Sequence, residues 1–373
     1  MVDEEAKQRL ERLAAYLKAD PTNGALLFDC AQAAIAVGDD ALATALFKRL
    51  EALEPLAGGV ANTAGIAAMR SGDQQTAQDW FAGALDSDPG DKALRFNIAW
   101  SRALGQDFEG AAEMLDSEVV NSLPQAAMLD MQISHELGRF DEAADKMAAF
   151  LVMFPAYPPL HAAASVLAMD LDQPDLARES AGRGGDHPDA LTTLATLDLG
   201  ERRLDDARRQ YGQALATRPG DPRARIGLGL VDMAEGRMQE AATQLDEGAE
   251  RFETHLGSWI AAGWAYLLAG DLLKARLRFE TALQHDESFG EAQGSLAVVE
   301  LLQGENASAK RRIAVARRLD GGAFSAALAA MLWEQSQGQP EKADRILQAA
   351  LRQPILPNGA TLTDALAKAL SGR

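Results

Sequence analysis

The sequence predicts an all-α fold, an α-solenoid superhelix of about ten tandem helix-turn-helix repeats. Ten alanines recur along the chain, and the differences between their successive positions are 34, 34, 32, 34, 30, 34, 34, 34 and 34. They are Ala43, Ala77, Ala111, Ala143, Ala177, Ala207, Ala241, Ala275, Ala309 and Ala343. A glycine often stands five residues before the alanine, and a large apolar residue often stands four residues after it. This period is typical of stacked helix pairs in which each repeat contacts only its neighbours.

Residues 258–286 show how one period forms two antiparallel helices. Apolar residues three or four apart mark the first helix: Trp259, Ala262, Gly263, Tyr266 and Leu267. Gly270 can adopt a positive φ without steric cost and so ends this helix, and Asp271 can cap the next. The second helix carries Leu272, Ala275, Phe279 and Ala282. Neither helix could bury its apolar stripe alone, so stability must come from neighbouring repeats.

The remaining elements follow the same period along the chain. The sequence begins with MVDEEAKQRLERL, a charged segment with a helical pattern. Prolines stand twelve positions beyond four of the alanines, at Pro55, Pro89, Pro155 and Pro219. Pro174 and Pro340 fall near the start of a second helix, where a missing N–H costs little. The last stretch, Leu356 to Arg373, predicts a final helix that caps the last repeat.

The segment 181–188, AGRGGDHP, interrupts the period. Three glycines in four positions disfavour a continuous helix. Two interpretations stay open: a kink or hinge, and an early helix end that packing absorbs. The charge also divides here, since residues 1–187 hold 14 Lys and Arg against 30 Asp and Glu, whereas residues 188–373 hold 22 against 25. We expect an acidic array at 1–187 and a second array with a capping helix at 188–373, joined as one solenoid with a kink.

Over nearly the whole chain, the pattern resembles the tetratricopeptide repeat family. The family's first-helix aromatic, Gly and Tyr fall on Trp259, Gly263 and Tyr266. Its second-helix Ala, aromatic and Ala fall on Ala275, Phe279 and Ala282, on Ala77, Phe81 and Ala84, and on Ala207, Tyr211 and Ala214. Elsewhere the chain departs from the pattern: Ala181 and Gly184 replace the bulky and small residues, and Glu118 replaces an Ala.

The resemblance assigns the first helices to an inner, concave face. Its geometry would point these residues toward a groove or its edge: Phe28, Asn62, Ile66, Met69, Phe96, Trp100, Val166, Met169, Leu230, Met233, Ile260, Trp264, Val298 and Leu332. All of them except Phe28 and Asn62 are candidate partner-binding residues. Burial of a bulky apolar side chain is worth about 1.5 to 3 kcal/mol, so an exposed row of them implies an absent partner. The alternative is that these side chains pack against adjacent repeats.

Two classes of function follow. The first is a non-catalytic protein interaction module, such as an adaptor, chaperone or assembly factor, whose apolar groove binds an amphipathic helix or an extended apolar segment of a partner protein. The alternative is a self-assembling scaffold built from the repeats. Family members that clamp a terminal carboxylate need Lys, Arg and Asn on successive first helices. The nearby candidates, Asn62, Arg70, Arg95 and Asn97, form an incomplete set.

The net charge of −19 disfavours a nucleic acid as the partner, because phosphates would be repelled. Two basic clusters are local exceptions: Lys310, Arg311, Arg312, Arg317 and Arg318, and Arg202, Arg203, Arg208 and Arg209. Each cluster has two interpretations. It is a solvated face balanced by nearby acids, or it is a docking patch for an acidic partner or for the chain's own acidic half.

Catalytic signals are weak, and we expect neither an enzyme nor a cofactor or metal site. The five histidines lie in different repeats without the close spacing of a metal helix. Cys30 is the only cysteine, which excludes an intrachain disulfide. No run approaches the roughly 20 apolar residues that cross a bilayer, so we expect no membrane insertion. The charged start lacks the apolar core of a secretory signal, which predicts a cytoplasmic protein, or a periplasmic one if a signal peptide has been removed.

Overall fold

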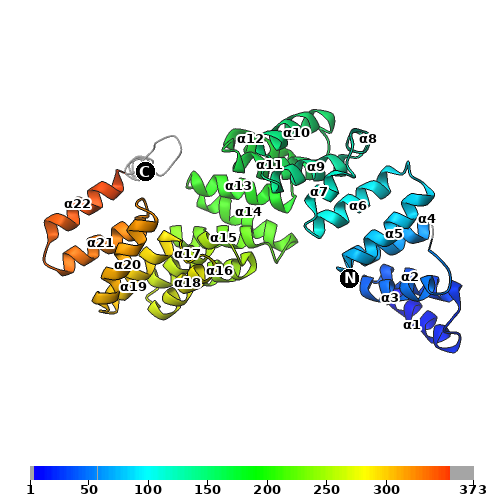
Figure 1. Cartoon of the computed structure of the whole chain (residues 1–373), viewed down its shortest axis with the longest axis horizontal. Coiled ribbons are helices and arrows are strands. Elements are labelled where there is room, and N and C mark those ends of the chain that lie inside the picture. Colours follow the sequence, from blue (N-terminus) through cyan, green and yellow to red (C-terminus); the bar gives the residue numbers. More distant parts are fainter. Residues whose placement is uncertain (1–3, 57, 353–373) are drawn as a thin grey trace. The chain divides into compact units, whose positions relative to one another are not determined.

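The computed structural model describes residues 4–56 and 58–352, and within them every regular element is an α-helix (Figure 1). Twenty-two helices follow one another in this part of the chain, with no strand among them. The predicted all-α solenoid class is therefore confirmed. The chain divides into two compact units, unit 1 up to Gly185 and unit 2 from Asp186, and each is described by itself.

Unit 1 holds α1 and five helix pairs, with the short α8 between the third and fourth pairs. The bounds are α1 Glu4–Ala19, α2 Gly24–Ala36, α3 Asp40–Glu51, α4 Gly58–Arg70, α5 Gln74–Ser87, α6 Lys92–Leu104, α7 Phe108–Ala112, α8 Ser117–Val120, α9 Pro124–Glu136, α10 Phe140–Met153, α11 Pro158–Asp170 and α12 Pro174–Gly184.

Up to residue 352, unit 2 holds five further pairs with no irregular helix between them. The bounds are α13 Pro188–Gly200, α14 Leu204–Thr217, α15 Pro222–Ala234, α16 Met238–Phe252, α17 Leu256–Leu268, α18 Leu272–His285, α19 Gly290–Leu302, α20 Asn306–Leu319, α21 Phe324–Ser336 and α22 Pro340–Leu351.

The ten recurring alanines lie on the second helices of the ten pairs. All ten are buried, and none is more than 5% exposed. The crossing of each pair is tightened further where a glycine of the first helix meets a ring of the second. A Cβ atom added to Gly263 would lie 2.3 Å from Cε1 of Phe279, and one added to Gly65 would lie 2.5 Å from Cε1 of Phe81. Small residues on one side and large ones on the other therefore set the distance between paired helices.

The turn within a pair forms as the sequence predicts. Gly270 has a φ of 86°, in the left-handed region that glycine adopts without strain. Asp271 then accepts a hydrogen bond from the backbone N–H of Lys274 at 3.0 Å and caps α18. Pro174 and Pro340 are the first residues of α12 and α22, as expected.

Two pairs depart from the regular unit where the sequence pattern is weakest. In the third pair the second helix is split, because α7 ends after five residues and α8 begins at Ser117. Asp116 stabilises this break: its Oδ1 accepts from two backbone N–H groups of α8, and its Oδ2 accepts from Nη1 of Arg95 at 2.8 Å. The second departure is α12, which ends at Gly184, followed by Gly185 with a φ of 61°. An early helix end is thus present, whereas the kink stays a prediction.

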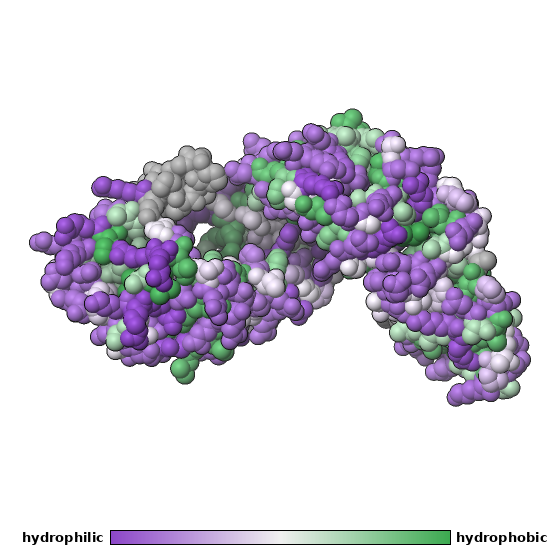
Figure 2. All heavy atoms as spheres, in the orientation of Figure 1, coloured by the Kyte–Doolittle hydropathy of each residue, from purple (hydrophilic) through white to green (hydrophobic). Residues whose placement is uncertain are grey.

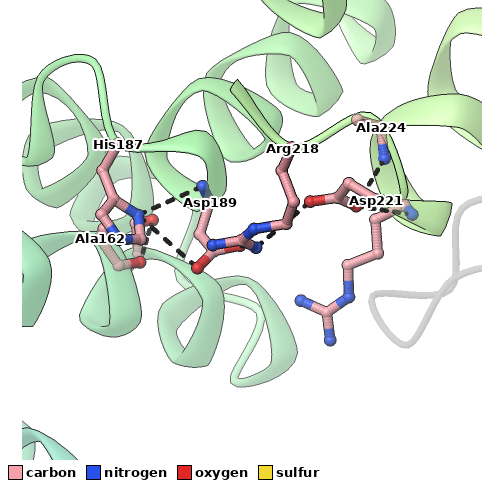
Figure 3. A network of polar contacts seen from close by, with 8 residues as sticks. Ala162, His187, Asp189, Arg218, Asp221 and Ala224 are labelled. Atoms are coloured by element: carbon pink, nitrogen blue, oxygen red, sulfur yellow. Dashed lines mark hydrogen bonds and ion pairs between the residues drawn. The ribbon is translucent and has the colours of Figure 1, made fainter. Parts of the chain in front are cut away.

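A chain of polar contacts joins the starts of α13 and α15 in unit 2 (Figure 3). His187 Nδ1 accepts a hydrogen bond from the backbone N–H of Asp189 at 3.4 Å. Oδ1 of Asp189 in turn accepts one from Nη1 of Arg218 at 2.7 Å. The same Arg218 nitrogen lies 3.4 Å from Oδ2 of Asp221, whose Oδ1 caps α15 by accepting the N–H of Ala224 at 3.1 Å. Arg218 therefore connects the N-terminal ends of two successive first helices.

Three first helices carry a buried carboxylate at the repeat position that Tyr266 occupies in α17. Asp198, Asp232 and Glu300 stand at this position in α13, α15 and α19. Asp232 and Glu300 are each one repeat period from Tyr266, and Asp198 is one period before Asp232. The three carboxylates are at most 4% exposed. Each binds an arginine: Asp198 binds Arg203, Asp232 binds Arg208 and Arg237 at 2.7 Å each, and Glu300 binds Arg312 at 2.9 Å. These pairs offset the cost of burying the charge and connect helices within and between repeats.

Two predictions from the sequence reach beyond what the described helices show. The predicted division into arrays at residues 1–187 and 188–373 stays a prediction. The predicted capping helix at Leu356 to Arg373 lies outside the described residues.

Candidate protein interaction surface

The twelve candidate partner-binding residues differ in exposure. Met69 and Val298 are buried, at 7% and 3% exposed, and belong to core clusters. Trp100 and Leu230 are exposed, at 43% and 36%. The other eight are half-buried: Ile66, Phe96, Val166, Met169, Met233, Ile260, Trp264 and Leu332. Most of them therefore contribute to packing between repeats while also presenting apolar atoms at the surface.

Unit 2 brings five of these residues together on successive first helices. Trp264 and Leu332 pack against the core cluster that contains Val298. Met233 and Ile260, with Trp264, pack against a neighbouring cluster. The half-buried members among them define a candidate apolar surface on these first helices.

We call this surface the first-helix row and define it by four equivalent places on α15, α17, α19 and α21. Its residues are Ile226, Leu230, Met233 and Ala234; Ile260, Trp264, Leu267 and Leu268; Gly294, Val298, Leu301 and Leu302; and Leu328, Leu332, Gln335 and Ser336. The four places are spaced by four, three and one residues, which puts them on one side of a helix. No member is charged, in a chain with 24% charged residues.

The most exposed apolar members of the row are two leucines that we did not predict. Leu268 and Leu302, the last residues of α17 and α19, are 53% and 55% exposed. They are one repeat period apart and so occupy the same place in consecutive repeats. Leu104 of α6 stands at that place in unit 1 and is 51% exposed. The sequence did contain a signal for this place, because a Leu stands seven residues before three of the repeat alanines.

Exposed large apolar residues also occur outside the first-helix row, such as Val152 at 82% and Leu273 at 76% exposed. Figure 2 shows that hydrophilic residues dominate the face in view and that hydrophobic atoms form separate patches on it. In unit 1, Trp100 and Leu104 lie one helical turn apart on α6, and the rings of Phe96 and Trp100 are 5.7 Å apart. These three residues form a smaller apolar patch in unit 1.

The two basic clusters have different surroundings. In the first, Arg203 pairs with Asp198, Arg208 with Asp232 and Glu235, and Arg209 with Asp206. In the second, on α20, Arg312 pairs with Glu300. The other four cations, Lys310, Arg311, Arg317 and Arg318, are exposed and have no carboxylate partner among the described residues.

Two side chains with nucleophilic atoms, Cys30 and Ser258, are buried in the packing of the helices. Cys30 is 1% exposed, and burial, followed by the neighbouring charge of Asp29, raises the pKa of its thiol. A thiolate is thereby disfavoured. Ser258 lies 2.6 Å from Nδ1 of His255 but is only 1% exposed, and both residues stand at the start of α17. This contact belongs to the helix end.

Two further kinds of feature are missing from residues 4–56 and 58–352. No group of three or more His, Cys, Asp and Glu in this part is placed to hold a metal ion. None of the helices there combines the length and apolar character that a membrane span requires.

Comparisons with known proteins agree with this architecture. The family model described as tetratricopeptide repeat matches residues 62–127 and 192–254. No curated protein matches the sequence. Among solved structures, the human IFIT1 dimer with PPP-AAAA is 13% identical, covers 94% of this chain and 95% of its own, and has a TM-score of 0.51. PilF of Pseudomonas aeruginosa is 14% identical over 58% of this chain and 97% of its own, with a TM-score of 0.47.

A further solved structure, MamA, is 19% identical, covers 43% of this chain and 93% of its own, and has a TM-score of 0.36. At 13% identity, the likeness to the IFIT1 structure concerns the fold alone. The matched segments fall in both units, and each contains the helix pairs and the buried crossing alanines described above. The chain thus contains tetratricopeptide repeats in both units, at residues 62–127 and 192–254.

Proposed function

We propose that this protein is a non-catalytic interaction module whose first-helix row binds the apolar face of an amphipathic helix from a partner protein. The observation that carries the proposal is the pair of equivalent, exposed leucines, Leu268 and Leu302, at the edge of an uncharged row. An adaptor, a chaperone and an assembly factor would each use such a surface.

The energetics favour a covered row. A fully buried leucine is worth about 1.5 to 3 kcal/mol relative to an exposed one. Leu230, Leu268 and Leu302 are each at least 36% exposed, so a partner that covers them recovers much of that free energy. The half-buried Trp264 between them is a rigid aromatic of the kind that dominates interfaces. Because the row is uncharged, the partner's contacting face needs no charged residue.

The spacing of the row favours a helical partner. Packed helices lie about 8 to 10 Å apart, and α19 packs directly on α21, so these two helices present their apolar residues at about that interval. Seven residues of an α-helix rise about 10 Å. A partner helix that crosses the first helices thus places one apolar residue on each repeat when its apolar residues recur every seven positions. In unit 1, the patch of Phe96, Trp100 and Leu104 supplies a second, smaller contact.

The test uses selection from a displayed library of amphipathic helices of about 20 residues, long enough to cross several repeats, followed by titration of the selected peptides. We expect Leu268→Lys/Leu302→Lys to lower peptide affinity more than tenfold, because two apolar contacts of about 1.5 kcal/mol or more are replaced by buried charges. Both leucines end their helices, where a lysine complements the helix dipole, so the variant folds.

The matched control is Leu273→Lys/Leu277→Lys. These two leucines are also exposed, at 76% and 50%, but they belong to the second helix α18. We expect this control to bind the peptides as the wild type does. Equal binding by all three proteins, or loss of binding in the control alone, contradicts the proposal.

A further inference from the structure

The second helix α20 carries positive charge that the described residues leave without carboxylate partners. Its sequence, NASAKRRIAVARRL, contains five basic residues and no acidic one. Arg312 is used internally, since it donates to Glu300 at 2.9 Å and to Gln293 at 2.7 Å. Other second-helix arginines are paired in the same way: Arg276 with Glu305, and Arg278 with Asp246. The remaining four cations of α20 have no such partner among the described residues.

These four cations form two parallel rows. Lys310 and Arg317 are seven residues apart, as are Arg311 and Arg318, and seven residues make about two helical turns, or about 10 Å. Ala314 lies between the rows, on the same side of the helix, and is exposed. Nζ of Lys310 lies 5.8 Å from the centroid of the Trp333 ring, which holds one corner in place. We call this surface the α20 face.

The helix α5 of unit 1 has the opposite character. Its sequence, QQTAQDWFAGALDS, contains no basic residue. Asp79 and Asp86 are exposed and seven residues apart, and the exposed Ala82 and Gly83 lie between them. Asp79 accepts a hydrogen bond from Gln75 at 3.0 Å, and neither aspartate has a cationic partner among the described residues. We call this surface the α5 face.

We propose that the α20 face of one molecule docks on the α5 face of a second copy. The seven-residue spacing of the aspartates matches that of Arg311 and Arg318, so both carboxylates can meet a cation at once. Ala314 on one side and Ala82 and Gly83 on the other allow the two helices to approach closely. The two faces differ, so the contact is head-to-tail, and each copy keeps one free face of each kind.

Charge complementarity favours a second copy as the occupant. Residues 1–187, which contain α5, hold 14 Lys and Arg against 30 Asp and Glu, whereas residues 188–373, which contain α20, hold 22 against 25, so the acidic part of one copy meets a less acidic part of the other. Exposed ion pairs are individually weak, so the contact requires high protein concentration and low salt.

The experiment measures the mass of the full chain by light scattering and sedimentation over a range of concentrations, in about 0.01 M and about 1 M salt, where the Debye length is about 30 Å and about 3 Å. We expect the wild type to associate with rising concentration at low salt and to be monomeric at high salt. Arg311→Glu/Arg318→Glu and Asp79→Arg/Asp86→Arg should each remain monomeric at low salt. Circular dichroism checks that both stay folded.

Mixing the two variants gives the sharpest readout. The reversed α20 face of the first then meets the reversed α5 face of the second, and the unchanged faces also match, so the mixture should associate although neither variant does alone. Arg202→Glu/Arg251→Glu controls for net charge, because it makes the same change at exposed arginines outside α20. This control should associate like the wild type.

Several results overturn the proposal. A wild-type protein that is monomeric at both salt concentrations overturns it. Association at low salt by Arg311→Glu/Arg318→Glu or by Asp79→Arg/Asp86→Arg alone overturns it as well. A mixture that stays monomeric also overturns it. If the reversals change the sedimentation coefficient of a monomer, α20 contacts α5 within one chain. If an acidic peptide binds α20 while the protein stays monomeric, the occupant is a different protein.

Discussion

At the scale of single residues, the absence of a side chain sets helix packing as much as its presence does. Phe279 and Phe81 are fully buried, and each ring fills the space beside a glycine of the preceding helix. Gly227, on the following helix α15, leaves comparable space for Tyr211, since a Cβ there would lie 2.1 Å from Cζ of the ring. The ring of Tyr211 is thereby held in a buried site, where its hydroxyl meets Oγ1 of Thr196 at 2.9 Å.

The burial of Tyr211 predicts a loss of stability at alkaline pH. Burial raises the pKa of Tyr211 to about 12, against about 10 in the unfolded chain. The folded state holds this proton more tightly, so its contribution is fully present below pH 10 and is lost as pH rises from about 10 to about 12. We expect the free energy of unfolding to fall by up to about 1.4 kcal/mol more per pH unit in the wild type than in Tyr211→Phe.

The measurement is urea unfolding of both proteins at several pH values between about 8 and 11. The phenylalanine keeps the ring and loses only the hydroxyl, so a constant offset of about 1 kcal/mol from the lost hydrogen bond is expected below pH 10. Curves that run parallel through the alkaline range would show that Tyr211 does not titrate differently in the folded state.

At the scale of elements, helices are ended and capped by residues of neighbouring repeats as well as by their own. Ala323, at the start of α21, has no side chain that could cap it. The carboxylate of Glu291, on α19, accepts the N–H of Phe324 at 2.6 Å and that of Ser325 at 3.3 Å instead. Ser325 Oγ donates back to the Glu291 carbonyl at 2.9 Å. The last described pair is therefore attached through its first turn to the pair before it.

Removal of this cap should loosen α21. We expect Glu291→Ala to cost about 1 kcal/mol, the usual value of a helix cap, which corresponds to about fivefold faster amide exchange in α21 and α22. Hydrogen exchange measured by NMR or mass spectrometry tests this. Glu287→Ala, at an exposed side chain in the preceding turn, is the control and should leave exchange in α21 unchanged. Equal protection in the two variants would rule out the capping role.

At the scale of the whole molecule, stability in a repeat array is a sum of local terms rather than the property of one core. The two units each have their own clusters of buried residues. Gly65 in unit 1 and Gly263 in unit 2 occupy equivalent repeat places against equivalent phenylalanines. The same substitution at the two sites therefore probes the two units separately.

We expect thermal unfolding to show more than one transition, because a long array need not unfold as one cooperative unit. Gly65→Ala should lower the temperature of one transition and Gly263→Ala that of another. Each should reduce the free energy of unfolding of its array by about 1 to 3 kcal/mol, since the added methyl overlaps a buried ring. Gly212→Ala is the control: it lies inside α14 with nothing within 4 Å of its Cβ position, and should be neutral or slightly stabilising. One shared transition that both variants lower equally would contradict the predicted division of the chain into two arrays.

The fold could be predicted from sequence because its signals are local and repeated. Alanine at a helix crossing, glycine at a turn and a capping aspartate act within one period. The alanine recurs in all ten periods and the glycine in most of them. The candidate surface was predicted in part for the same reason. Trp264 and Leu332 follow the apolar period of the first helices, and both pack against the same core cluster from α17 and α21. That they bind a partner stays a prediction.

What the sequence could not decide is which of the periodic residues a neighbouring repeat covers. Val298 and Leu302 lie one turn apart on α19, yet the first is 3% exposed and the second 55%. Likewise, Arg312 meets a buried carboxylate whereas Arg311, beside it, has no such partner among the described residues. Periodicity determines the side of a helix on which a residue lies, through interactions along one chain segment. Burial and ion pairing depend on the distance to other segments, and only the packing of the repeats determines that distance.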